Sequence, residues 1–186
     1  MKFEEILPKL DDIMATMPVE EKKLLYDEAS KIPNGGIIVD IGTCDGASAF
    51  IMALANPEVK VWTIDPQVGP HFLEKRKELG LEDRVFLLED TSNNAVLDWN
   101  KDIDLLFIDG LHSQLGITDD INNWGKFVKN KRVVLLHDYI WYGDTVKKAM
   151  DEADIKLNLL EVISGLYDNK PVGIARTRKD ECNCTS

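Results

Sequence analysis

Two short segments of the sequence each bring an aspartate and a histidine to the end of an apolar run. Asp109 ends the first run, and His112 follows three residues later. His137 ends the second run, and Asp138 is the next residue. Carboxylates and imidazoles are the side chains that transfer protons and bind divalent cations. If the two runs are neighbouring parallel strands, these four side chains converge at the edge of a sheet where ligands bind.

This cluster suits the activation of a hydroxyl group. A divalent cation held by Asp109 and Asp138 would lower the pKa of a bound hydroxyl, and a nearby imidazole would remove its proton. Oxygen ligands suit Mg²⁺, and the two aspartates would supply two of about six. The alternative is that both aspartates cap loops and that the histidines satisfy local hydrogen bonds. The third histidine, His71, directly follows Pro70 and is expected at the surface.

A glycine-bearing turn lies upstream, in Asp40-Ile41-Gly42-Thr43-Cys44-Asp45-Gly46. Gly42 and Gly46 let the backbone approach a ligand with no Cβ in the way, and the N-terminus of a following helix favours electron-rich groups. A pyrophosphate at that helix end would meet Asp40 and Asp45, so the acidic surroundings favour a cationic ligand. The alternative is a turn that only links a strand to a helix.

Two further apolar runs end in polar residues that could hold a nucleoside. Asp65 lies 19 residues after Gly46, and a carboxylate at this spacing can accept hydrogen bonds from two vicinal ribose hydroxyls. The same spacing also fits NAD. After the next run, Asp90 or Ser92 could bond the amine or ring nitrogens of an adenine, or could cap the helix that follows.

Short runs rich in Val, Ile and Leu alternate with segments of helical periodicity from about residue 36 onward, which predicts a parallel, doubly wound sheet. Residues 18–26 have the proline and the acidic first turn of a capped helix. The predicted strands are 36–41, 59–65, 84–88, 103–109 and 132–137, with helices beginning near residues 45, 69, 92, 113 and 142. Apolar stretches at 157–162 and 172–175 flank a turn at 167–171, which indicates an antiparallel pair.

The expected fold is therefore α/β: a Rossmann-like sheet of seven strands, mostly parallel with an antiparallel last strand, and helices on both faces. The closing hairpin separates two superfolds. Dinucleotide dehydrogenases end with a sixth parallel strand, whereas class I methyltransferases insert a seventh, antiparallel strand beside the sixth. The hairpin favours the methyltransferase fold over that of an NAD-dependent enzyme.

The glycine turn resembles a known family. Asp40-x-Gly42-x-x-x-Gly46 resembles motif I of the class I S-adenosylmethionine-dependent methyltransferases, without its middle glycine. Residues 41–48 resemble the variant in the metal-dependent O-methyltransferases of the catechol and macrolide-sugar types, a family-24-like group. The resemblance implies that Asp40 helps to hold the methionine end of the cofactor. The full set of expected cofactor-binding residues is Asp40, Gly42, Thr43, Gly46, Ser48, Asp65, Asp90, Thr91, Ser92 and Asp109.

The same resemblance assigns roles to the aspartate and histidine cluster. The metal-binding acids of the catechol type fall on Asp109 and Asp138, and the macrolide-sugar motif Asp-Gly-x-His falls on residues 109–112, which implies that His112 is the general base. Two positions depart from these patterns. His137 stands where the macrolide-sugar branch has a metal-ligating glutamate, and Tyr139 where the catechol branch has an asparagine. With His137 as a third ligand the expected metal is Mg²⁺ or Mn²⁺, with Fe²⁺ and Zn²⁺ tolerated.

These motifs predict a methyltransferase that uses S-adenosylmethionine and methylates an oxygen of a hydroxylated small molecule with help from a divalent cation. Its expected catalytic residues are His112, Asp109 and Asp138. Three alternatives stay open: a metal-independent or nitrogen-directed methyltransferase, a non-catalytic subunit that binds S-adenosylmethionine, and an NAD-dependent enzyme.

Composition sets the wider expectations. The 186 residues, 44% hydrophobic and 30% charged, fit a single methyltransferase domain with a helical segment at 1–34, a core at 35–177 and a flexible tail at 178–186. A net charge of −11 disfavours nucleic acid and membranes as partners. No apolar run reaches about 18 residues, so a cytoplasmic protein is expected, with a homo-oligomer allowed. Cys182 and Cys184 could bind metal or oxidise, or could be unstructured thiols.

Overall fold

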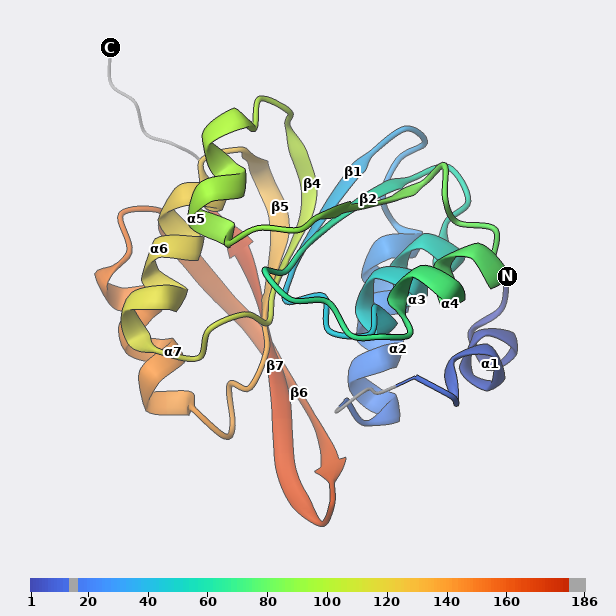
Figure 1. Cartoon of the computed structure of the whole chain (residues 1–186). Coiled ribbons are helices and arrows are strands. Elements are labelled where there is room, and N and C mark those ends of the chain that lie inside the picture. Colours follow the sequence, from blue (N-terminus) through green and yellow to red (C-terminus); the bar gives the residue numbers. More distant parts are fainter. Residues whose placement is uncertain (14–16, 181–186) are drawn as a thin grey trace.

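A seven-stranded sheet runs through the middle of the molecule, with helices on both faces (Figure 1). The computed structural model describes residues 1–13 and 17–180. The strands are β1 Ile37–Ile41, β2 Lys60–Ile64, β3 Val85–Leu88, β4 Ile103–Ile108, β5 Val128–Leu136, β6 Leu157–Tyr167 and β7 Lys170–Lys179. The α-helices are α1 Phe3–Ile6, α2 Val19–Ser30, α3 Ala47–Ala55, α4 Phe72–Glu78, α5 Ser92–Ala95, α6 Gln114–Gly125 and α7 Gly143–Glu152, with 3₁₀ turns η1 Leu7–Leu10 and η2 Val96–Asp98.

The order of the strands, β3-β2-β1-β4-β5-β7-β6, places β1 and β4 at the centre of the sheet. From β1 the chain moves outward to β3, returns across the sheet to β4, and then moves outward on the other side. All of the pairs among β1 to β5 are parallel. In such a sheet the ligand crevice opens where the strand order reverses, here at the C-terminal ends of β1 and β4.

The last strand, β7, lies between β5 and β6 and is antiparallel to both. Its hairpin with β6 closes through Asp168 and Asn169, whose φ angles of 48° and 60° are those of a two-residue turn that matches the twist of the strands. The expected fold class, a mostly parallel sheet with an antiparallel last strand, is thereby confirmed.

Strand β5 begins at Val128, four residues before the predicted start at 132. Its first half is missed by an apolar pattern because Lys129, Asn130 and Lys131 are all exposed. The register between β4 and β5 also shifts between Ile103 and Leu105. This irregular stretch lies at the opposite end of the sheet from the ligand crevice, so it does not disturb the site.

Side chains alternate between two cores, one on each face of the sheet. Ile38, Leu105 and Phe107 belong to the core under α2 and α3. The intervening residues, such as Val39 and Leu106, belong to the core under α6 and α7. Helix α3 is buried along almost its whole length, because it packs between the sheet and α2. Figure 1 shows α2, α3 and α4 on one side of the sheet and α5, α6 and α7 on the other.

The C-terminal boundary differs slightly from the expected one. Strand β7 continues to Lys179, so residues 178–179 of the predicted tail belong to the sheet. Cys182 and Cys184 lie outside the described residues. No helix within the described part of the chain is long and apolar enough to cross a membrane.

Candidate active site

The turn after β1 requires glycine at two positions. Gly42 has a φ of 101°, and a Cβ built on it would lie 2.1 Å from the backbone oxygen of Asp109. Gly46 has a φ of 91° and forms the N-cap of α3, where a Cβ would lie 2.7 Å from the rings of Phe50 and Phe72. The turn is therefore pressed directly against the end of β4. This close approach brings the two central strands together at the crevice.

A buried hydrogen-bond network holds the turn from beneath. Asp40 Oδ2 accepts hydrogen bonds from Thr63 Oγ1 at 2.6 Å and from Ser48 Oγ at 3.2 Å. The hydroxyls of Thr43 and Thr63 are 2.6 Å apart. All four side chains are buried, and Asp40 Oδ1 has no hydrogen-bond partner among residues 1–13 and 17–180. Asp40 faces α3 because it alternates with Ile41, which faces the crevice, so it supports the turn from below.

The buried Asp40 predicts a pH dependence of stability. Burial raises the pKa of Asp40 to about 7, against the smaller opposing effect of the Thr63 and Ser48 hydrogen bonds. The carboxyl of an unfolded chain has a pKa of about 3.9. Because the folded pKa is the higher one, charging Asp40 destabilises the fold as pH rises from about 4 to about 7, and the cost is constant above that.

In urea unfolding, Asp40→Asn should therefore gain stability relative to wild type between pH 5 and pH 8. Taking the difference between the two proteins cancels the pH effects of the other carboxylates. A difference that does not change with pH would show that Asp40 is not charged at the expense of folding.

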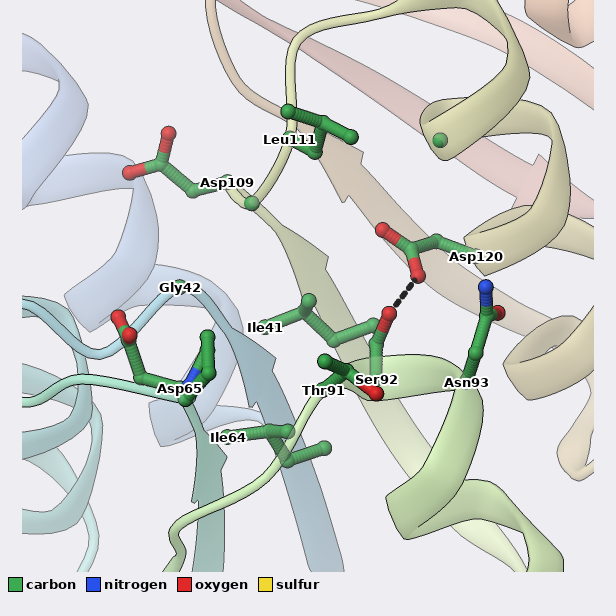
Figure 2. Close-up of a pocket in the computed structure, with 13 residues that line it drawn as sticks. Ile41, Gly42, Ile64, Asp65, Thr91, Ser92, Asn93, Asp109, Leu111 and Asp120 are labelled. Atoms are coloured by element: carbon green, nitrogen blue, oxygen red, sulfur yellow. Dashed lines mark hydrogen bonds between the residues drawn. The ribbon is translucent and has the colours of Figure 1, made fainter.

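A cavity of about 510 Å³ opens at the reversal point of the strand order. This volume is in the range of small-molecule sites. Figure 2 shows Ile41, Ile64 and Leu111 around its middle, with Asp65 and Asp109 on one side and Ser92 and Asp120 on the other. The lining residues are Ile41, Gly42, Ile64, Asp65, Pro66, Thr91, Ser92, Asn93, Asp109, Gly110, Leu111, Gly116 and Asp120.

The cavity includes part of the predicted cofactor set. Gly42, Asp65, Thr91, Ser92 and Asp109 line it. Asp40, Thr43, Gly46 and Ser48 are not among the lining residues and form or support the turn instead. Asp90 is exposed and also outside the lining, where its Oδ1 accepts hydrogen bonds from Thr91 N and Asn94 Nδ2. Asp90 therefore braces the start of α5 from the position before its N-cap, which is Thr91.

Asp65 is held in place by the loop around it. Its Oδ2 accepts a hydrogen bond from Cys44 N at 3.1 Å, and its Oδ1 accepts one from Gln67 N at 2.9 Å. Each carboxylate oxygen keeps a further lone pair. The side chain is thus fixed at the wall of the cavity and can still accept hydrogen bonds from a ligand.

The opposite wall contains a paired acid that the motifs did not assign. Asp120 on α6 accepts a hydrogen bond from Ser92 Oγ at 2.5 Å. Burial raises the pKa of Asp120 to about 6, which the Ser92 hydrogen bond opposes. Its position could have been found from the spacing of Ile117, Ile121 and Trp124, which places Asp120 on the buried face of the helix.

The predicted aspartate and histidine cluster is present at the ends of β4 and β5. His112 Nε2 lies 3.4 Å from Asp138 Oδ2 and 3.8 Å from Asp109 Oδ1. The ring of Tyr142 stacks on the imidazole of His112, with centroids 5.2 Å apart and planes within 7°. Asp138 has a φ of 55°, a left-handed conformation that is uncommon outside glycine and recurs at functional sites. His112 is therefore oriented by two carboxylates and one aromatic ring.

His137 lies deeper, and both of its ring nitrogens face carboxylates. Nδ1 is 2.8 Å from Asp109 Oδ1, an ion-pair distance without hydrogen-bond alignment. Nε2 is 3.0 Å from Glu21 Oε2, on α2. Burial lowers the pKa of His137, but the neighbouring carboxylates outweigh it and raise the pKa to about 10. His137 is therefore held between two acids, and Glu21 is a site residue that the sequence motifs did not identify.

A divalent cation needs several oxygen or nitrogen donors directed at one point. Among residues 1–13 and 17–180, no three or more histidines, cysteines, aspartates or glutamates are grouped as metal ligands. His137, the expected third ligand beside Asp109 and Asp138, instead has its Nε2 3.0 Å from Glu21 Oε2 and its Nδ1 2.8 Å from Asp109 Oδ1. In this arrangement the side chains do not fit a metal site. Asp109 and Asp138 face the imidazole rings of His112 and His137 instead.

Comparisons with known proteins agree with this geometry. The family described as Methyltransferase domain matches residues 39–139, which include the glycine turn, Asp65 and the aspartate and histidine cluster. Cofactor-bound Rv0187 from MTB has a similar structure, with a TM-score of 0.76 and 19% identity over 96% of this chain and 89% of that chain. The O-methyltransferase TomG from Streptomyces achromogenes, solved with S-adenosylmethionine, has a TM-score of 0.73 and 16% identity over 96% and 89% of the two chains.

An rRNA methylase from Streptococcus thermophilus is also similar, with a TM-score of 0.68 and 16% identity over 90% of this chain and 99% of that chain. At these identities the structures show a shared fold, and a fold that also occurs in an rRNA methylase does not support the expected exclusion of nucleic acid. The family match covers more than half of the sequence, and the strand order and glycine turn agree with it. The chain therefore belongs to the Methyltransferase domain family and is a class I S-adenosylmethionine-dependent methyltransferase.

Proposed function

We propose that this methyltransferase transfers a methyl group to a hydroxyl oxygen of a small molecule, with His112 as the general base. The observation that carries this proposal is the position of His112. It follows Leu111, which lines the cavity, and its Nε2 faces both Asp138 and Asp109. An imidazole supported by carboxylates is the arrangement that removes a proton from a weakly acidic hydroxyl.

The cavity fits the cofactor by its shape and its charge. Asp65 is free to accept hydrogen bonds from the ribose hydroxyls, and Ser92 and Asp120 provide polar groups for the adenine on the opposite wall. The acidic side near Asp65 and Asp109 suits a ligand that carries positive charge. S-adenosylmethionine supplies there a methyl group on a sulfonium centre. Gly42 keeps that wall open because its backbone approaches with no side chain.

The proton of the acceptor passes to His112 as the oxygen attacks the methyl carbon and the carbon–sulfur bond breaks. Because Nε2 faces the carboxylates, Nδ1 is the nitrogen left to accept the proton. Asp138 and Asp109 then stabilise the imidazolium that forms, and Tyr142 holds the plane of the ring. The proton can leave to water from the half-exposed ring, which returns His112 to its basic form.

The central experiment is calorimetry with S-adenosylhomocysteine, followed by assays of methyl transfer to phenolic, sugar, amine and RNA acceptors. Binding together with transfer to a hydroxyl probe is expected. Absence of binding with and without Mg²⁺ or Mn²⁺ would contradict the cofactor site, and transfer only to amine or RNA would contradict the acceptor. The net charge of −11 favours a small molecule over RNA.

Cation assistance through Asp109 and Asp138 is the second candidate: the side chains do not form a metal site as they lie, but both carboxylates are partly exposed and would have to move to bind a cation. A binding-only subunit is the third. Assays with and without a chelator separate the first two: unchanged turnover supports His112 acting without a metal, and loss restored by Mg²⁺ or Mn²⁺ supports a cation. Cofactor binding with no transfer to any acceptor would favour the binding-only subunit.

Asp65→Asn should weaken binding of S-adenosylhomocysteine by about 10- to 100-fold. The substitution replaces one acceptor oxygen by a donor, and a hydrogen bond to a charged group contributes about 1.5–3 kcal/mol. Calorimetry measures the change directly. The control is Glu89→Gln, which removes a charge near the end of the adjacent strand from a residue outside the cavity lining. Equal affinities in both variants would show that Asp65 does not contact the cofactor.

A further inference from the structure

Helix α2 brings a fully buried carboxylate to the site from a segment outside the matched domain region. Glu21 lies in the first turn of α2, and its relative exposure is 0%. Its neighbour Glu20 is exposed on the same turn. Burying a carboxylate is costly unless it is paired. Glu21 therefore needs a partner within the site whose contact offsets the cost of its burial.

The partner of Glu21 is His137, 116 residues later in the chain. The register pairs Ile108 with Leu136, so the next residues, Asp109 and His137, lie side by side and point to the face covered by α2. The imidazole thus bridges Glu21 Oε2 at 3.0 Å and Asp109 Oδ1 at 2.8 Å. Its ring also meets Phe107 edge-on, with an interplanar angle of 86°.

The chain of contacts continues to the proposed base. Asp109 Oδ1, the atom that faces His137, is also the atom 3.8 Å from His112 Nε2. If the His137 ring rotated, Asp109 Oδ1 would lose its contact with His137 and would no longer be held toward His112. Glu21 opposes that rotation because it holds the far nitrogen of the ring, in the way that a carboxylate behind a histidine fixes its orientation.

We propose that Glu21 is a positioning residue for methyl transfer, holding the His137 imidazole so that it aims Asp109 at His112. This role rests on the proposed function of His112. Helix α2, which precedes the residues that the family match covers, is by this proposal a working part of the active site. Glu21 does not line the cavity, so its effect is expected on turnover and not on cofactor affinity.

The test compares Glu21→Gln with the matched control Glu20→Gln, which removes the same charge from the same helical turn. Glu21→Gln should lower kcat about tenfold or more, by analogy with the carboxylates that orient metal-bound histidines, whose removal costs about 10- to 100-fold. Its KM for S-adenosylmethionine and its affinity for S-adenosylhomocysteine should stay within about twofold of wild type. Glu20→Gln should match wild type in all three. The acceptor probes are 3,4-dihydroxybenzoate and methyl glucoside.

A second readout needs no turnover. The protein has only three histidines, so their ring nitrogen signals can be assigned by NMR with His71→Gln and His112→Gln. Glu21→Gln should move the signals of both His137 and His112 and leave those of His71 in place. The double variant Glu21→Gln/His137→Gln should lose no more turnover than the larger single loss, because both act through one contact. Glu21→Asp serves if the Gln variant does not fold.

The outcomes separate this inference from the function on which it rests. If wild type methylates neither probe, the acceptor assignment fails while the NMR comparison still decides whether Glu21 orients His137 and His112. Wild-type kcat in Glu21→Gln, or His112 signals that do not move, would overturn the positioning role. An equal loss in Glu20→Gln would also overturn it, because the cause would then be the charge of the helix terminus.

Discussion

Replacing His112 by glutamine should lower kcat for methyl transfer by about 100- to 10,000-fold, the usual contribution of a positioned general base. Glutamine keeps the size and polarity of the side chain but cannot take a proton. Affinity for S-adenosylhomocysteine should change by no more than about twofold, because His112 is outside the cavity lining. Turnover assays and calorimetry on the same preparation measure the two quantities.

The control for this experiment is His71→Gln, which changes an exposed histidine just before α4. Its turnover should equal that of wild type. If the His112 variant keeps full activity at neutral pH and loses it only at low pH, the acceptor ionises without a base from this side chain. That result would show that a bound cation, or the acidity of the acceptor itself, allows the acceptor to lose its proton without His112.

Gly42→Ala should abolish measurable cofactor binding, raising the dissociation constant of S-adenosylhomocysteine by about 100-fold or more. The new Cβ would lie 2.1 Å from the backbone oxygen of Asp109, and backbone cannot move aside as a flexible side chain can. The turn or the end of β4 must shift, and a displacement of about 1 Å within a site can cost about 100-fold. The φ of 101° adds strain for any residue with a Cβ.

A matched control separates the clash from the strain. Gly80 has a φ of 63°, and a Cβ built on it meets no atom within 4 Å. Gly80→Ala should therefore cost about 1 kcal/mol of stability and leave cofactor affinity unchanged. If Gly42→Ala binds as tightly as wild type, the close contact between the turn and β4 is not needed for the site.

Much of the fold could be predicted from local pattern. The strands β1 to β4 and the starts of α5, α6 and α7 lie within a residue or so of their expected positions. The strands are short apolar runs bounded by polar residues, and α5 and α6 begin after the capping residues Thr91 and Ser113. The start of β5 could not be found in this way, since its first half is exposed. The order of the strands is not encoded in the local pattern of the residues and is known from the structure.

The acidic residues of the site also divide into those that the local sequence identifies and those that it does not. Asp40, Asp65, Asp109 and Asp138 could be identified because each sits at a strand end, where the topology places the ligand crevice. The sequence pattern identifies Glu21 only as a first-turn acid of a capped helix, although Glu21 shares a helical face with Leu24, Leu25 and Glu28. An acid within an apolar stripe of a helix is the signal that could have found it. Local sequence does not say what such an acid meets.

The sequence by itself determined that a glycine turn, several aspartates and two histidines stand at the ends of the strands, because turn chemistry and side-chain alternation are local. The tertiary structure decided what each of them contacts. Only the register of β4 on β5 places Asp109 beside His137, and only the packing of α2 brings Glu21 to its other nitrogen. These contacts join residues 28 and 116 positions apart, so they depend on packing that no short segment of the chain can encode.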